Sequence, residues 1–133
     1  MQPPIDLVGS WELQRYETWN ADGVVSTPLG EAPLGFAVFD AAGNAFIQLA
    51  RRPPDADCPF SDAVSQELAK SFGAYFGVFR VDSAQTQITI RVQASNMASY
   101  VGSDQIRPFV ITGNQLFLGI PGEYRAILRR ASK

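Results

Sequence analysis

The chain has 133 residues, 46% hydrophobic and 18% charged, a balance typical of one folded domain, so we expect residues 1–133 to form a single domain. Its net charge is −2 with no basic stripe, so we expect no nucleic-acid partner. The lack of histidine and the single cysteine exclude Ser–His and Cys–His nucleophile pairs, imidazole metal sites and an internal disulfide. The sequence has no secretory signal and no apolar stretch of about 18 residues, which predicts a cytoplasmic protein that does not enter membranes.

Strand patterns dominate the sequence. The segment 87–94 is the clearest, because Ile88, Ile90 and Val92 alternate strictly with polar residues. Turn sequences such as Asp22-Gly23 and Gly113-Asn114 separate the segments. In chain order, we predict strands at 11–19, 24–26, 34–40, 45–51, 74–81, 87–94, 105–112, 115–120 and 123–131. Eight or nine strands with short links predict an all-β fold, a single closed antiparallel β-barrel.

One helix is expected among these strands, over residues 62–72. Ser61-Asp62 offers an N-cap, and Val64, Leu68 and Phe72 recur every four residues on one face. Gly73 is a suitable stop. We expect this short helix to cap one end of the barrel.

A glycine two residues before a tryptophan, Gly9 and Trp11, opens the first strand. Such a pair predicts that backbone and indole ring pass closely. An arginine of the last strand, chosen among Arg125, Arg129 and Arg130, would then lie flat on the ring, with a cation–π contact of about 0.5–2 kcal/mol. We assign this structural role to Arg129. First and last strands would therefore be neighbours.

The chain resembles the lipocalin-like domain family, short one-domain proteins related to the lipocalin and calycin barrels. The motifs that carry the resemblance are Leu7-Val8-Gly9-Ser10-Trp11, Glu17-Thr18 before Asp22-Gly23, Pro28-Leu29-Gly30, Tyr75-Phe76-Gly77 and the segment 100–107. The resemblance implies a barrel with a ligand-sized cavity but not one activity, although some similar small barrels act as cyclases or isomerases. The chain departs from the family at Gln93, where members often have glutamate, so no catalytic glutamate is carried over there. It departs also at Arg15 and Tyr100.

The first strand holds the sharpest candidate site. With a period of two, Arg15, Glu17 and Trp19 share the face of Trp11. If that face is inward throughout, Arg15 and Glu17 are catalytic candidates, with Glu17 a proton shuttle whose pKa is set by burial against Arg15. If a bulge follows Leu13, both side chains lie on the surface instead. The pattern leaves these alternatives open.

Other candidate residues are scattered along the chain. Arg107 suits a carboxylate, enolate or phenolate, or else lies at the rim and pairs with Asp104. Tyr75, as a catalytic group, and Tyr100 suit a carbonyl oxygen, or else pack beneath the helix. Gln48 is a neutral ligand contact or exposed. The remaining candidates are aromatic residues of a cavity wall that are equally suited to the core: Trp19, Phe36, Phe76 and Phe109.

These residues predict that the protein binds one small, largely apolar molecule with a polar or anionic head, of polyketide or terpenoid type. We expect no metal and no cofactor, and a monomer or homodimer. The first hypothesis is a cofactor-free isomerase or cyclase of secondary metabolism, in which Glu17 or a tyrosine moves a proton and Arg15 or Arg107 stabilises an oxyanion. The alternatives are a non-catalytic carrier and a side-chain-filled barrel that serves as an assembly partner.

Overall fold

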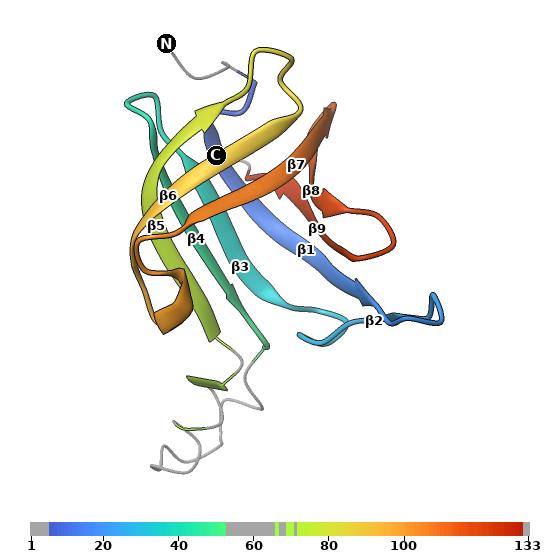
Figure 1. Cartoon of the computed structure of the whole chain (residues 1–133). Helices are drawn as coiled ribbons and strands as arrows, with labels where there is room; N and C mark the ends of the chain where they lie inside the picture. The colour runs from blue at the N-terminus through green and yellow to red at the C-terminus, as the bar shows by residue number, and fades with distance from the viewer. Residues whose placement is uncertain (1–5, 53–65, 67–68, 71, 132–133) are drawn as a thin grey trace.

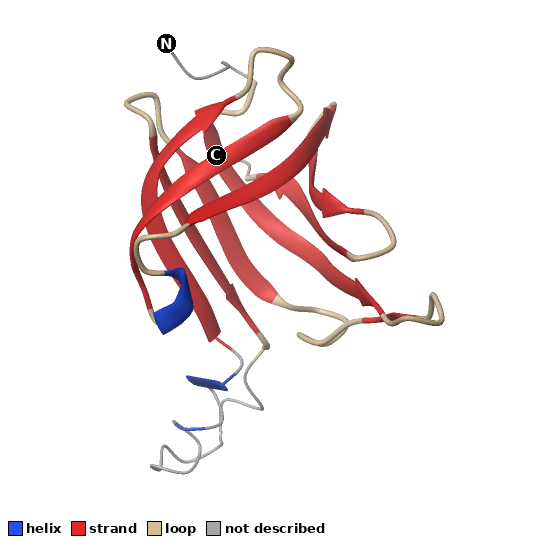
Figure 2. Ribbon diagram, in the orientation of Figure 1, coloured by secondary structure: helices blue, strands red, loops and turns tan. Residues whose placement is uncertain are grey.

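The computed structural model describes residues 6–52, 66, 69–70 and 72–131, and strands make up most of it (Figure 2). The elements in chain order are β1 (Gly9–Trp19), β2 (Val25–Ser26), β3 (Leu34–Phe39), β4 (Asn44–Ala50), β5 (Phe72–Val81), β6 (Gln87–Ser95), the 3-10 turn η1 (Ala98–Tyr100), β7 (Asp104–Thr112), β8 (Gln115–Ile120) and β9 (Tyr124–Arg130). All predicted strands are present, with bounds within two residues of those expected.

Eight of the strands close into an antiparallel barrel (Figure 1). The strand order is β2-β1-β3-β4-β5-β6-β7-β8-β9, and β1 also pairs with β9. The short β2 pairs only with the end of β1, at Thr18 and Trp19. The predicted closed barrel is therefore confirmed, and with it the expectation that first and last strands are neighbours.

The predicted helix lies mostly outside the described residues, which leave out 62–65, 67–68 and 71. Gln66, Ala69 and Lys70 are helical. Phe72 and Gly73, however, do not end a helix, because they begin β5 and pair with Ala50 and Leu49 of β4. The assignment of Phe72 to the helix and of Gly73 to its stop is wrong because ladder pairing with β4 starts at Phe72.

Side chains alternate between the inner and outer faces of each strand, and the inward ones fill one end of the barrel with apolar groups. Phe39 and Phe79 meet edge to face, with ring centroids 5.2 Å apart. The predicted alternation of β6 is confirmed, since Ile88, Ile90 and Val92 are all buried. Phe109, a predicted ligand contact, is buried in this core and is not among the residues that line the cavity described below. The part of the chain that the structure describes thus has a packed core at the end nearest Trp11.

Trp11 is the floor of the barrel. Its indole Nε1 donates a hydrogen bond to the carbonyl oxygen of Leu7 at 2.9 Å. The guanidinium of Arg130 stacks on the ring, 4.1 Å from the centroid, and donates to the carbonyl oxygens of Val8 and Asp6. Gly9 has φ +137°, and a Cβ there would lie 3.0 Å from Nη1 of Arg130. The glycine is needed because the arginine occupies the space of a side chain.

The arginine on Trp11 is Arg130 and not Arg129, which corrects the sequence-based assignment. Arg130 pairs with Trp11 in the register of β9 on β1 and shares the inward face with Ala126 and Leu128. Arg129 is one residue out of step, so its side chain is exposed on the outer face.

A bulge in β1 changes which of its residues face inward. Leu13 pairs with Leu128 and Arg15 with Ile127, so Gln14 has no partner of its own on β9. One extra residue reverses the facing of every side chain that follows. Tyr16, opposite Ala126, therefore points inward as Leu13 does before the bulge, although the two residues are three positions apart. Of the two alternatives for Arg15 and Glu17, the structure has the bulged one, with both outside.

Replacing Arg130 with methionine tests the floor. We expect Arg130→Met to lower the free energy of unfolding by about 1–3 kcal/mol, because a ring contact and two hydrogen bonds to carbonyl oxygens are lost together. Urea denaturation followed by tryptophan fluorescence measures the change. Arg129→Met, on the same strand but exposed, is the matched control and should stay within about 0.5 kcal/mol of wild type. Equal losses in the two variants would contradict the assignment.

Candidate functional site

The barrel encloses a cavity of about 450 Å³ in which the polar side chains are concentrated around one arginine. All four tyrosines of the chain line it. The polar groups of its lining come from β1, β5, η1, β7 and β9, and they are Tyr16, Tyr75, Tyr100, Gln105, Arg107 and Tyr124. The apolar groups include Phe39, Ile47, Ile88, Met97 and Leu118.

Arg107 is the centre of this polar group. Its Nη2 donates to Oε1 of Gln105 at 2.9 Å and to the hydroxyl of Tyr100 at 3.4 Å. Its guanidinium carbon lies 5.5 Å from the ring centroid of Tyr124. The alternative pairing with Asp104 does not occur, because Asp104 faces outward and pairs with Arg91 at 3.5 Å. The described residues that line the cavity include no carboxylate, so no acid among them balances the charge of Arg107.

Two of the tyrosines around Arg107, Tyr75 and Tyr16, have raised pKa values that favour the neutral phenol. The rings of Tyr75 and Tyr100 pack edge to face with centroids 5.4 Å apart. Burial raises the pKa of Tyr75 above its ordinary value, although the charge of Arg107 opposes this. Burial also raises the pKa of Tyr16, with a further contribution from Tyr100. Burial by itself would lower the pKa of Arg107, but the electrostatic contributions of Tyr75, Tyr124 and Tyr100 outweigh it and raise the pKa, so the guanidinium stays charged.

The combination of one fixed cation with several phenol donors suits an oxyanion. Guanidinium groups and hydroxyls both donate hydrogen bonds to carboxylate, enolate or phenolate oxygens. Surrounding apolar side chains strengthen such bonds by excluding water. Among the described residues, no group of three or more Cys, Asp or Glu side chains is placed to hold a metal ion.

Glu17 lies on the outer face, in a cluster that we call the outer clamp: Arg15, Glu17, Trp19, Phe117 and Arg125. Arg15 Nε donates to Oε2 of Glu17 at 2.8 Å, and Arg125 donates to Oε1 at 3.0 and 2.7 Å. The guanidinium of Arg125 lies 5.8 Å from the Trp19 ring centroid and 5.7 Å from that of Phe117. Glu17 is only 7% exposed, so this carboxylate is buried although it lies outside the barrel.

The outer clamp removes Glu17, Arg15 and Trp19 from the candidate ligand contacts. None of the three lines the cavity. The hydrogen bond from Arg15, followed by that from Arg125, lowers the pKa of Glu17 despite its burial. A carboxylate held charged by two arginines on the far side of the wall is not a proton shuttle for a molecule inside.

Three other predicted contacts also face outward. Phe36, Gln48 and Phe76 are exposed because Ala37, Ile47 and Tyr75 take the inward positions next to them. Of the predicted site residues, the structure brings together Tyr75, Tyr100 and Arg107.

Sequence reasoning missed Tyr16, Gln105 and Tyr124. Gln105 is two residues from Arg107, and Tyr124 is four residues from Leu128, so the alternation of strand side chains predicts that both face inward. The inward position of Tyr16 could be predicted only by knowing of the bulge.

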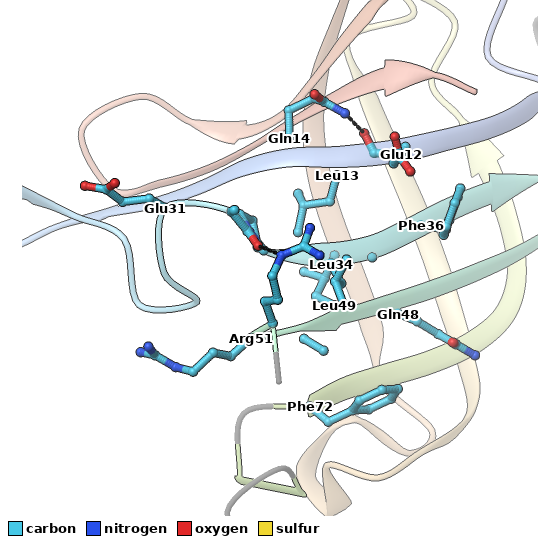
Figure 3. A pocket seen from close by; sticks show the side chains of 15 residues that line it. Glu12, Leu13, Gln14, Glu31, Leu34, Phe36, Gln48, Leu49, Arg51 and Phe72 are labelled. Atoms are coloured by element: carbon cyan, nitrogen blue, oxygen red, sulfur yellow. Dashed lines mark hydrogen bonds between the residues drawn. The ribbon is translucent and has the colours of Figure 1, made fainter. Parts of the chain in front are cut away.

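A second hollow, of about 680 Å³, lies beside β1, β3 and β4 and is larger than the cavity (Figure 3). We call it the outer groove, and its lining includes Glu12, Leu34, Phe36, Gln48 and Phe72. Its arginines are already engaged, since Arg51 donates to the carbonyl oxygen of Pro28 and Arg52 to that of Ala32. We place the candidate site in the smaller cavity because there the polar groups converge on one point.

The outer clamp predicts a pH-dependent stability. We expect Glu17→Gln to lower the free energy of unfolding by about 1–3 kcal/mol at pH 7, because one carboxylate oxygen is replaced by an NH2 donor that faces an arginine and the other becomes a neutral acceptor. Because the folded pKa of Glu17 is lowered, its contribution is complete above the ordinary carboxyl pKa and lost as the pH falls through the folded value. The difference from wild type should therefore shrink below about pH 4 in urea titrations.

The matched control is Glu123→Gln, which changes an exposed carboxylate just before β9. It should stay within about 0.5 kcal/mol of wild type at every pH. A Glu17→Gln variant as stable as wild type at pH 7 would rule out the outer clamp.

Comparison with known proteins agrees with the barrel. A family model described as a lipocalin-like domain matches residues 8–129, which is most of the chain. No curated protein matches the chain. Among the described residues, no helix is long and apolar enough to cross a membrane. Because the family model spans nearly the whole barrel from the Gly9–Trp11 floor to β9, the chain belongs to the lipocalin-like domain family.

Proposed function

We propose that the protein binds one small, largely apolar molecule whose anionic head, a carboxylate, enolate or phenolate, is held by Arg107. The observation that carries the proposal is the position of Arg107. It is a partly buried cation inside an apolar barrel, ringed by tyrosine hydroxyls, and the described lining supplies no carboxylate. A buried charge without a counter-charge is costly, so an anionic ligand would both gain from the site and stabilise it.

The walls of the cavity support an apolar body for this ligand. Phe39 and Leu128 pair with Gly9 and Leu13 beside the floor of Trp11, whereas Tyr16 and Tyr124 lie further along the pairing of β1 with β9, and Tyr124 contacts Arg107. The volume, about 450 Å³, is within the range of small-molecule sites. The ligand would therefore point its apolar part toward the floor and its head toward β7.

Isomerase or cyclase activity in secondary metabolism is the second candidate. Tyr75 favours it, because a neutral buried phenol beside a guanidinium can donate a proton or a hydrogen bond to a carbonyl oxygen as it becomes an oxyanion. A general base is harder to assign. Glu17 is outside the cavity, and burial disfavours the phenolate of Tyr16 and Tyr75. Binding is therefore the function that the geometry supports best, while a polyketide or terpenoid ligand and a cytoplasmic location stay predictions from the sequence.

Matched probes test the role of Arg107. We expect isothermal titration calorimetry to show that 2-naphthoate binds at least about tenfold more tightly than its neutral isostere 2-naphthamide, because only the carboxylate gains charge-assisted hydrogen bonds. Arg107→Met should abolish this preference while leaving the affinity for the amide nearly unchanged. Arg129→Met, an exposed arginine outside the cavity, is the control and should keep the preference.

The result is decisive in both directions. Equal affinity of the wild type for both probes, or a preference that survives in Arg107→Met, would overturn the proposed head-group site, as would the failure of both probes to bind. Conversion of polyketide or terpenoid precursors by the wild type, and its loss in Tyr75→Phe with binding retained, would favour the enzyme over the carrier.

A further inference from the structure

The start of β7 places three polar side chains on the same face of the chain. Ser103 comes directly before β7, and Gln105 and Arg107 follow at steps of two residues. All three are partly buried. Asp104, between the first two, has the opposite parity and pairs outside the barrel with Arg91. We call Ser103, Gln105 and Arg107 the β7 network.

Each hydrogen bond of the β7 network has one possible direction. Ser103 Oγ donates to the carbonyl oxygen of Tyr100 at 2.6 Å and accepts from Nε2 of Gln105 at 2.8 Å. Oε1 of Gln105 accepts from Nη2 of Arg107 at 2.9 Å. A carbonyl oxygen can only accept and a guanidinium can only donate, so the direction is fixed at both ends. The network therefore links the backbone of Tyr100 to the cation of the cavity.

Ser103 determines which end of the Gln105 amide faces Arg107. The hydroxyl has one hydrogen, which is used on Tyr100, so it offers Gln105 only a lone pair. That lone pair binds the amide NH2 and leaves Oε1 toward the guanidinium. Without the hydroxyl, the amide can turn over and set its N–H groups against a cation, which removes a hydrogen bond and adds repulsion. Ser103 does not line the cavity, so it acts on Arg107 through Gln105.

The amide of Gln105 is also neutral, and this matters for a buried cation. Arg107 donates to the amide oxygen of Gln105, the hydroxyl of Tyr100 and the carbonyl oxygen of Ile106, three acceptors without charge. They hold the guanidinium in place and reduce the cost of its burial. They do not cancel its charge, which stays available to an anion. Glutamate has nearly the shape of glutamine, so replacing one NH2 group by oxygen would close this site as an ion pair.

We infer that Ser103 and Gln105 are positioning residues that make the cavity selective for anions. Ser103 orients the amide of Gln105, and the amide holds Arg107 without neutralising it. This inference rests on the proposed head-group site and adds the residues that keep its cation available. A ligand carboxylate then meets a guanidinium whose direction is set before binding, so less conformational freedom is lost when the charge-assisted hydrogen bonds form.

Replacing Gln105 with glutamate tests the neutrality of the amide. We expect isothermal titration calorimetry to show that Gln105→Glu binds 2-naphthoate no more tightly than 2-naphthamide, a loss of at least about tenfold in the wild-type preference, because the new carboxylate pairs with Arg107 and repels the ligand. Gln115→Glu is the matched control, because Gln115 is exposed and pairs with the exposed Arg129 across β8 and β9. It makes the same change beside an arginine outside the cavity and should keep the full preference.

Variants of Ser103 test the orientation of the amide. Ser103→Ala should lower the preference for 2-naphthoate about three- to tenfold, because the hydrogen bond that orients the amide is lost. Ser103→Thr, which keeps the hydroxyl, should restore it. In a Gln105→Met background, Ser103→Ala should have no further effect on the preference, because no amide is left to orient. An equal effect of Ser103→Ala in both backgrounds would overturn its action through Gln105.

The outcomes separate this inference from the proposed function. A preference that is lost in Arg107→Met but kept in Gln105→Glu would leave the head-group site standing and overturn the role of Gln105. A Ser103→Ala variant with the full preference would overturn the role of Ser103. A wild type without any preference would overturn the head-group site and this inference together. Far-ultraviolet circular dichroism checks that each variant is folded.

Discussion

One unpaired residue, Gln14, decides what the first strand contributes to each side of the barrel wall. Before it, Trp11 and Leu13 point inward and build the floor. After it, Tyr16 points inward, and Arg15 and Glu17 point outward. Without the extra residue, the register would place a charged pair in the cavity and a tyrosine outside. The chemistry of the cavity therefore depends on a bulge, and the site is a cation among phenols and not a buried acid–base pair.

Two arginines of β9 stabilise its pairing with β1 at two different positions along the strands. Arg130 faces inward and stacks on Trp11, and Arg125 faces outward and holds Glu17. Both arginines combine a hydrogen-bonded charge with an aromatic face, which offsets the cost of covering that charge. Closure leaves no open edge between first and last strands, so the inside of the barrel is available for a ligand and the outside for side-chain contacts.

The sequence predicts the strands and their closure well, because alternation records which face of each strand is buried. It also indicates an arginine on Trp11, and the shared parity of Ala126, Leu128 and Arg130 identifies which one. It does not predict the bulge, because glutamine at position 14 carries no conformational signature and burial of Leu13 is the same with or without it. The prediction that Phe36 and Phe76 line the cavity is wrong for a different reason from the missed bulge. Aromatic residues are expected inside, and only pairing shows that Phe36 and Phe76 lie opposite outward positions.

The facing of Tyr16 and Glu17 is the central claim, and ligand affinity tests it most directly. With 2-naphthoate in isothermal titration calorimetry, Tyr16→Phe should weaken binding about three- to tenfold, since one hydrogen-bond donor near Arg107 is lost. Folded Glu17→Gln should bind with the affinity of wild type, because its side chain is outside the cavity. The opposite result, weaker binding by Glu17→Gln and unchanged binding by Tyr16→Phe, would show that Glu17 faces the ligand and would contradict the bulged first strand.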